Sequence, residues 1–297
     1  MTLPASDRPG PAADRTGPAG DRPGPIVPAT LDGWSLLHQA FRLRWPALRA
    51  LSPSARATLA SDAARALELP PGEGATGFVQ LLGHKGDLLL VHARRDFDAL
   101  AQAQLHVASS ALFEYLEPTF SYVSIVELGM YDMTGKLYAE LAGRGLEAGT
   151  EGFDQAFAEE MATQARRVGS RLFLELPRRR HVCFYPMNKR RGETKNWYSA
   201  PFDDRAAMMR EHGHIGRKYA GKVTQIISGS IGFDDWEWGV DLFADDPAVF
   251  KQLIYEMRFD RASADYAEFG PFAVGLQFAA SELGTLLEGR TPALTRA

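Results

Sequence analysis

One histidine stands where it could hold a single metal atom. His212 is followed by Gly213 in a helical pattern, and the missing side chain at Gly213 would let a flat ring system approach the imidazole. One neutral imidazole is enough to hold a haem iron. His214 cannot join His212 on one ion, because residues two apart on a helix point about 200° apart. Two alternatives therefore stay open for His212: an axial ligand, or an ordinary surface or core histidine.

A tyrosine on a predicted strand and a lysine just past that strand offer redox and acid–base chemistry. Tyr185 and Lys189 lie four residues apart in the segment Phe184–Lys189. A phenol can lose an electron and a proton together, so beside an oxidising iron Tyr185 could become a radical. Lys189, just past the strand, would supply positive charge. Simple packing within the strand remains the plainer interpretation of Tyr185.

Two further features indicate binding. Gln225 is an amide inside the apolar segment Val223–Ser230, and a buried amide needs hydrogen-bond partners, so it is a structural group or a pocket residue. Residues 178–222 contain twelve basic and four acidic residues, a net charge of +8 in a chain of net charge −4. This basic segment is either a solvated face or a site for phosphates or carboxylates.

The elements that must position these residues occur in two runs of the same order. The first run contains an ambiguous segment, a helix with Ser52 as its N-cap, two strands around a turn at 83–86, a long helix and a strand. These elements span Trp34–Phe41, Pro53–Leu69, Phe78–Leu82, Asp87–His92, Phe97–Leu116 and Phe120–Leu128. If the first segment is a strand, the order is β-α-β-β-α-β.

The second run repeats that order. Its elements span His181–Met187, Pro201–Tyr219, Val223–Ser230, Trp236–Phe243, Asp246–Tyr266 and Phe272–Phe278. Two such runs predict an α+β fold of two tandem ferredoxin-like halves, of the dimeric α/β-barrel type. Helices would cover one face of each sheet, and the other face is most simply buried against the other half.

The predicted organisation has four parts. Residues 1–30 repeat an Asp-Arg-x-Gly-Pro motif and are expected to form a disordered tail. Residues 31–130 form the N-terminal half, and residues 131–178 form a connector with a helix near Phe153–Val168. Residues 179–297 form the C-terminal half, which carries most of the candidate residues.

Composition excludes several classes of protein. The 297 residues, 45% of them apolar, suit one large or two smaller globular domains. The single cysteine, Cys183, cannot form an internal disulfide, a CxxCH haem attachment or a multi-cysteine zinc site, so a cytoplasmic location is expected. No apolar run approaches the roughly 20 residues of a membrane span, and the N-terminus lacks a secretory signal. The net charge gives no whole-chain argument for nucleic acid.

Several motifs carry a resemblance to a known family. They are Tyr185–Arg191, Asn196–Tyr198, Met209–Arg217, Gly221–Gly239 and Met257–Asp260, with a weaker match in pattern at Ser121–Leu128. These segments resemble the chlorite-dismutase-like haem family, and most closely its coproheme decarboxylase branch in the Firmicutes-type form. The first 30 residues do not match.

The resemblance implies an activity and its participants. Iron-coproporphyrin III would be both substrate and redox centre, hydrogen peroxide the oxidant, and haem b the product after two propionates become vinyl groups. It also implies two ferredoxin-like halves per subunit, a homopentamer and a transient contact with coproporphyrin ferrochelatase. No nucleic acid partner is implied.

The resemblance also assigns roles. His212 matches the axial iron ligand, Tyr185 the radical-forming tyrosine and Lys189 the lysine that assists the second decarboxylation. Gln225 matches the distal residue, where chlorite-degrading relatives carry an arginine and actinobacterial decarboxylases a histidine. The remaining matches are substrate contacts: Arg171, Ser263, Met187 and Tyr131.

Three alternatives remain beside the decarboxylase. Chlorite dismutase would need positive charge at the distal position, which the Gln225 amide cannot supply. A non-catalytic haem carrier or sensor would need neither Tyr185 nor Lys189. An anion- or RNA-binding protein would use the basic segment and would contain no iron.

Overall fold

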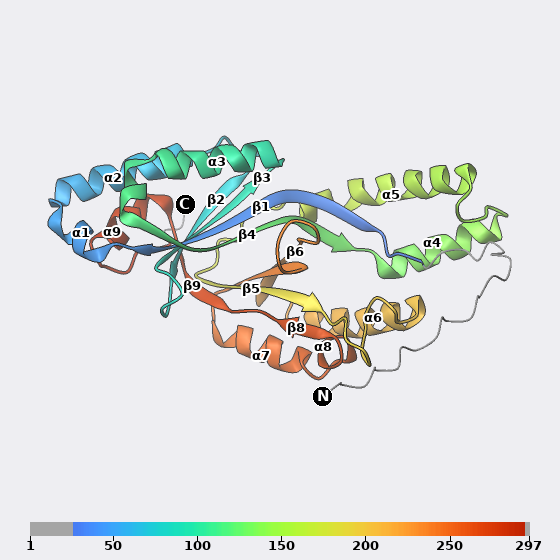
Figure 1. Cartoon of the computed structure of the whole chain (residues 1–297). Helices are drawn as coiled ribbons and strands as arrows, with labels where there is room; N and C mark the ends of the chain where they lie inside the picture. Colours follow the sequence, from blue (N-terminus) through green and yellow to red (C-terminus); the bar gives the residue numbers. More distant parts are fainter. Residues whose placement is uncertain (1–25, 295–297) are drawn as a thin grey trace, which may run out of the picture.

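The computed structural model describes residues 26–294, and its strands close into a barrel (Figure 1). Eight antiparallel strands follow the order β7-β6-β4-β1-β3-β2-β9-β5, and β5 pairs in turn with β7 to complete the ring. The three-residue strand β8 adds to the free part of β5. A closed ring leaves only short sheet edges.

Each half of the chain contributes four barrel strands. The first half contains β1 (Thr30–Leu43), α1 (Trp45–Ala50), α2 (Pro53–Ala66), β2 (Ala75–Leu81), β3 (Leu88–Arg94), α3 (Phe97–Ser109) and β4 (Leu116–Gly129). The second contains β5 (His181–Lys189), α6 (Phe202–Lys218), β6 (Val223–Gly229), β7 (Trp238–Ala244), α7 (Ala248–Met257), α8 (Arg261–Ala264), β8 (Ala267–Phe269), β9 (Ala273–Phe278) and α9 (Leu283–Leu287). Within the halves the spatial orders are β4-β1-β3-β2 and β9-β5-β7-β6. Both are the ferredoxin-like order, which confirms the predicted fold class.

The halves meet along two seams. At the first seam β2 pairs with β9 from Phe78↔Phe278 to Leu81↔Gly275. At the second seam β4 pairs with β6 only at Ile125↔Gly229 and Val126↔Ser228. Because the two sheets join edge to edge, their inner faces enclose one interior. In this way each half buries the sheet face that its own helices leave uncovered.

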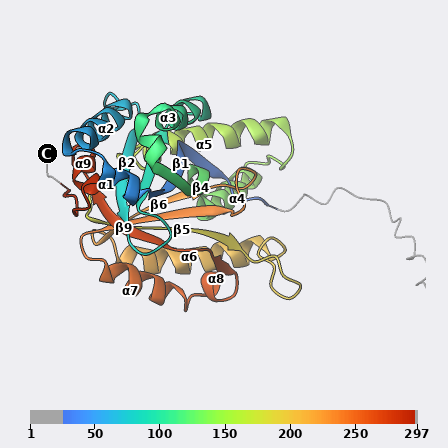
Figure 2. The same ribbon diagram turned by 60° about the vertical axis from the view of Figure 1, so that its left-hand side comes forward.

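Three apolar cores follow from this closure. The barrel interior is filled from both halves, by residues such as Leu36, Val79, Val126, Val182 and Phe243. Helices α2, α3 and α9 cover the outside of the N-terminal strands, and α6 and α7 cover the outside of the C-terminal strands (Figure 2). Strand residues thus alternate between the shared interior and a helix-covered outer face.

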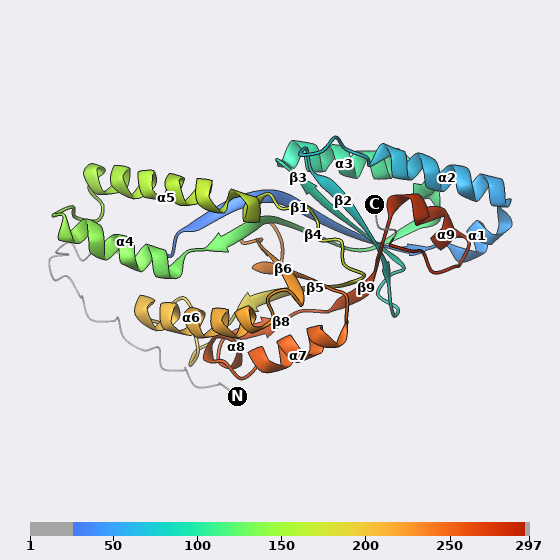
Figure 3. The same ribbon diagram turned by 180° about the vertical axis from the view of Figure 1, so that it is seen from behind.

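Two helices lie between the halves. α4 (Tyr131–Gly143) and α5 (Glu151–Leu172) form a pair that projects beyond the barrel where β1 begins and β4 ends (Figure 3). The side chains of Leu137, Leu141 and Phe153 form their own small core. Among residues 26–294, no helix has the length and apolar character needed to cross a bilayer.

Several predicted bounds change for identifiable reasons. The ambiguous segment Trp34–Phe41 is part of strand β1, and Ser52 caps α2 by accepting a hydrogen bond from the Ala55 amide. The helix predicted over Phe97–Leu116 ends at Ser109, and a 3₁₀ turn at Ala111–Tyr115 leads into β4.

The helix predicted over Asp246–Tyr266 is interrupted after Met257, because Asp260 caps the separate helix α8. Most of the predicted disordered tail, residues 1–25, lies outside the described residues, and Thr30 already belongs to β1.

Candidate functional site

Five side chains form the outer face of β5, β6 and β7 opposite α6, and this set is called the open sheet face below. They are Tyr185, Met187, Gln225, Ile227 and Trp238. Alternation along each strand gives them one direction, and the register Tyr185↔Val240↔Ile227 aligns the strands. All except Tyr185 are only half-buried, so the helices do not cover this face completely.

His212 is held by a buried carboxylate. Its Nδ1 lies 2.8 Å from Oδ2 of Asp260, which is itself fully buried, while the His212 side chain is 29% exposed. A carboxylate only accepts, so Nδ1 carries the proton and Nε2 has the lone pair. This is the arrangement that orients a metal-binding imidazole and raises its basicity. No group of three or more potential metal ligands occurs among the described residues, so any iron bound there would depend on this one imidazole.

The Asp260 carboxylate accepts hydrogen bonds from two different groups. Its Oδ1 accepts from the Ser263 amide at 2.8 Å, which caps α8, and its Oδ2 accepts from His212. Burial opposes ionisation, but the hydrogen bond and charge of His212 and the Ser263 contacts outweigh it, so the pKa of Asp260 lies below its usual value. Asp260 is therefore an anion at neutral pH.

Lys189 is buried beside this pair. Its Nζ donates to the Ala262 carbonyl at 3.0 Å and lies 4.5 Å from the ring centroid of Trp197. Burial lowers the pKa of Lys189 to about 8, although the charges of Asp260 and Glu237 oppose the shift. Lys189 can therefore give up a proton near neutral pH.

Tyr185 is enclosed by aromatic rings. It is 5% exposed, stacks on Phe272 at a centroid distance of 4.6 Å and lies 5.8 Å from Phe269. Burial, with a smaller contribution from Cys183, raises the pKa of Tyr185, and Arg258 opposes this. The phenol stays protonated at neutral pH, as a donor of a hydrogen atom must.

Gln225 lies under α6 one turn beyond His212. A Cβ placed on Gly216 would be 3.7 Å from the Gln225 Nε2 and 3.4 Å from the Met257 Cε. These are ordinary van der Waals distances, so this turn of the helix lies directly over Gln225. His212 and Gln225 thus belong to opposing walls, the helix and the open sheet face.

The predicted substrate contacts are distributed unevenly. Ser263 is 6% exposed, and its Oγ lies 3.5 Å from the His212 Nδ1. Tyr131 packs edge-on against Trp197 at 6.2 Å, so one indole separates it from Lys189. Arg171 is exposed in the last turn of α5, and no described contact joins it to the other candidates.

The basic segment is not one patch. Arg178, Arg179 and Arg180 precede β5, whereas Lys189 ends it. Six of the twelve basic residues pair with carboxylates from elsewhere in the chain. These pairs are Arg190–Glu268, Arg191–Glu237, Lys195–Asp265, Arg210–Asp132, Lys218–Glu256 and Arg179–Asp245. The net charge of +8 therefore overstates the positive potential that an anion would meet.

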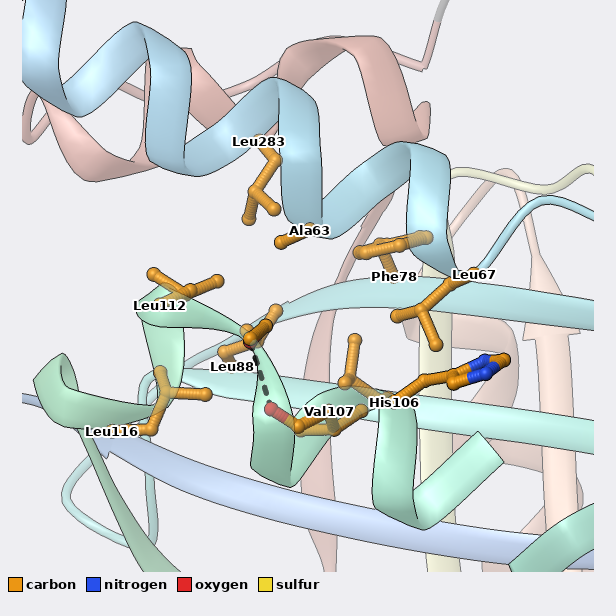
Figure 4. Close-up of a pocket in the computed structure, with 11 residues that line it drawn as sticks. Ala63, Leu67, Phe78, Leu88, His106, Val107, Leu112, Leu116 and Leu283 are labelled. Carbon is orange, nitrogen blue, oxygen red and sulfur yellow. Dashed lines mark hydrogen bonds between the residues drawn. The ribbon is translucent and has the colours of Figure 1, made fainter. Parts of the chain in front are cut away.

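A hollow elsewhere in the molecule is too small to bind a ligand. It measures about 10 Å³ and lies between α2, α3 and the N-terminal strands, where Leu67, Phe78 and Leu112 point into it (Figure 4). The hollow has room for about one water molecule, and its lining is almost entirely apolar. This hollow therefore offers no ligand site.

Comparison with known proteins gives a consistent picture. The family model for chlorite dismutase matches residues 56–278. A relative from Natronomonas pharaonis, whose name offers haem binding as a conjecture, is 43% identical over 87% of this chain. A similarly named relative from Haloquadratum walsbyi is 40% identical over 89% of the chain. The chain spans 41% and 48% of the lengths of these two curated relatives.

Comparison with solved structures points to the same family. A structure described as a novel heme-binding protein from Thermus thermophilus has a TM-score of 0.76 and 39% identity, and it covers 90% of this chain and 100% of its own. A mutant chlorite dismutase from Candidatus Nitrospira defluvii, with a TM-score of 0.65, 18% identity and coverage of 86% and 96%, shares the fold. The extent of the family match and the 39–43% identities show that this chain belongs to the chlorite dismutase family.

Proposed function

We propose that the protein is a coproheme decarboxylase, which converts iron-coproporphyrin III to haem b with hydrogen peroxide. The observation that carries the proposal is that Asp260 both holds His212 and caps α8, whose Ala262 carbonyl accepts from the buried Lys189, while the same half of the chain encloses the phenol of Tyr185. A protein that only carries haem needs an axial ligand but neither a buried ammonium nor a buried redox-active phenol.

The residues suit a flat iron porphyrin. The open sheet face offers half-buried apolar and amide groups, and α6 opposes it with an imidazole whose Nε2 is free of the carboxylate contact. Gly216 shows how closely helix and sheet approach one turn beyond that imidazole. His212 would hold the iron from the helix side, and Gln225 would face it from the sheet.

Each decarboxylation needs two oxidising equivalents, which the substrate's iron supplies with peroxide. One propionate, one hydrogen peroxide and one proton give one vinyl group, one carbon dioxide and two waters. Tyr185 gives up its phenolic hydrogen and then takes a hydrogen atom from the propionate β-carbon. Lys189, with a pKa lowered by burial to about 8, supplies positive charge and a proton near the second propionate.

The distal amide favours this reaction over the degradation of chlorite. Gln225 carries no charge, and an anionic oxychlorine species gains more from a guanidinium. Ser263, Met187 and Tyr131 would complete the substrate contacts. Arg171, which is exposed on α5, would reach a propionate only from the rim. A homopentamer and a transient contact with coproporphyrin ferrochelatase also remain predictions.

The test is direct. Purified protein is mixed with iron-coproporphyrin III and titrated with hydrogen peroxide, and the porphyrins are followed by mass spectrometry. Stepwise loss of two formic-acid equivalents, ending at haem b, is the expected result. Binding without a change in mass would refute the decarboxylase, and oxygen release from added chlorite would then identify a chlorite dismutase.

A further inference from the structure

A carboxyl group from the N-terminal half reaches the open sheet face across the second seam. Glu127 lies near the end of β4, and the pairs Ile125↔Gly229 and Val126↔Ser228 fix the register there. Continuing that register places Glu127 beside Ile227, two residues along β6 from Gln225. Glu127 is therefore the acidic neighbour of the open sheet face on β4.

Gly229 makes room for this carboxyl. A Cβ on Gly229 would lie 2.3 Å from the Glu127 Oε2, well inside contact distance. Above the same glycine the Trp238 indole, from the next strand, points its Nε1 at the Glu127 Oε1, 3.5 Å away. No unusual backbone angle requires a glycine there, so the close approach of the carboxyl is its physical reason.

The surroundings of Glu127 favour its protonated form. Asp32 is its direct cross-strand partner on β1 and is exposed to solvent. Burial, and then the charge of Asp32, raise the pKa of Glu127, while the Trp238 contact opposes the shift. Tyr131 on α4 also faces this group, and Arg205 in turn faces Tyr131. A carboxylate with a raised pKa is a better base near neutral pH than an ordinary glutamate.

We propose that Glu127 is the proton-transfer group on the sheet side of the porphyrin site, an inference that rests on the proposed function. The Glu127 carboxylate takes one proton from hydrogen peroxide as the peroxide binds. It returns that proton to the outer oxygen when the O–O bond breaks, so that this oxygen leaves as water. The two electrons that reduce the peroxide come from the bound substrate.

Gln225 and Glu127 can play different roles on this face because an amide and a carboxylate differ chemically. Gln225 can hydrogen-bond to a peroxide but cannot accept its proton at neutral pH, whereas a carboxylate can. Lys189 is separated from this face because its ammonium contacts the Ala262 carbonyl and Trp197. Glu127 is a partly buried carboxyl on the sheet side, held by the Trp238 indole.

Cyanide association tests the proposal without turnover. Hydrogen cyanide must lose its proton when it binds ferric iron as cyanide, so a nearby base accelerates the step. Stopped-flow rates are measured against pH on haem-loaded protein for the wild type, Glu127→Gln and Glu127→Asp. Glu127→Gln should be slower by about 100-fold or more at neutral pH, and Glu127→Asp should recover part of the loss.

Two variants serve as controls. Asp32→Asn should move the midpoint of the pH profile to lower pH and leave the plateau rate unchanged, because it removes the like charge beside Glu127. Glu117→Gln, an exposed carboxylate on the same strand that pairs with Arg42, should leave the whole profile unchanged.

The possible outcomes distinguish a proton-transfer role of Glu127 from a structural role and from failure of the proposed function. A Glu127→Gln protein that binds haem and cyanide with the wild-type rate and pH profile would overturn the role of Glu127. Loss of rate in Glu127→Gln without recovery in Glu127→Asp, and with no shift in Asp32→Asn, would assign Glu127 a purely structural role. If wild-type protein gave no porphyrin absorption at all, the proposed function itself would fail.

Discussion

Replacing Asp260 by asparagine should weaken the binding of iron by the His212 imidazole, although it changes only one side-chain group. In the native protein the two oxygens of Asp260 do different work, since Oδ1 accepts from the Ser263 amide and Oδ2 from the His212 Nδ1. An asparagine side chain has one oxygen and one NH₂ group. It can therefore satisfy only one of these two donors.

Either choice has a cost that can be estimated. If the oxygen of the new amide stays with Ser263, the NH₂ group faces the His212 Nδ1, and the imidazole must move its proton to Nε2, where it blocks iron binding. If the oxygen turns to His212, the α8 cap is lost at a cost of about 1 kcal/mol. The loss of such a carboxylate partner typically weakens metal binding by about 10- to 100-fold. We expect iron-porphyrin affinity to fall within that range.

The assay has two readouts. Titration with iron porphyrin gives the affinity, and resonance Raman spectra of the ferrous form give the iron–imidazole stretching frequency. Asp260→Asn should weaken both, whereas Asp265→Asn, at the other end of α8 and paired with the exposed Lys195, should change neither. Wild-type affinity and frequency in Asp260→Asn would refute the role of this carboxylate.

The remaining predictions concern four residues. His212→Ala should abolish the iron–imidazole signal, and an unchanged Raman spectrum would mean that another group holds the iron. Tyr185→Phe should bind iron-coproporphyrin III normally but release no haem b, which mass spectrometry can check. Lys189→Ala should accumulate the three-propionate intermediate, and in the wild type the second step should slow as pH rises through about 8, because the ammonium loses its proton there; a flat stopped-flow pH profile would contradict this. Gly229→Ala should lower the free energy of unfolding by about 1–3 kcal/mol, measured by urea denaturation, because its Cβ would meet the Glu127 carboxyl.

Alternation and turn residues made most of the barrel predictable. The hairpin around residues 83–86 and the repeated strand order identified both ferredoxin-like halves, and Ser52 identified the start of α2. α4 was missed because Gly135 and Thr134 weaken its helical pattern, although Thr134 is fully buried. β8 has only three residues, too few for a periodic signal.

The candidate site was predictable where one residue type implies one chemistry. His212, Tyr185 and Lys189 were selected in that way, and the structure adds the partners of each: Asp260 for His212, the Ala262 carbonyl for Lys189 and Phe272 for Tyr185. Asp260 was overlooked because its function depends on a capped turn that joins α7 to α8. Glu127 resembles a solvent-facing residue of an amphipathic strand, and only the β4–β6 pairing reveals what it faces.

The two-seam closure has a consequence for synthesis on the ribosome. The N-terminal strands are complete at Gly129, but β4 must wait for β6 and β2 must wait for β9, which ends at Phe278. At roughly 5–20 residues per second, the intervening chain of about 150 residues takes about 7–30 s to appear. Until β6 is complete at Gly229 the nascent chain has two unpaired sheet edges, and the edge of β2 then stays unpaired until β9; such edges are templates for wrong pairing. Slower translation between β4 and β9 should therefore increase aggregation, and a chaperone that shields strand edges should reduce it.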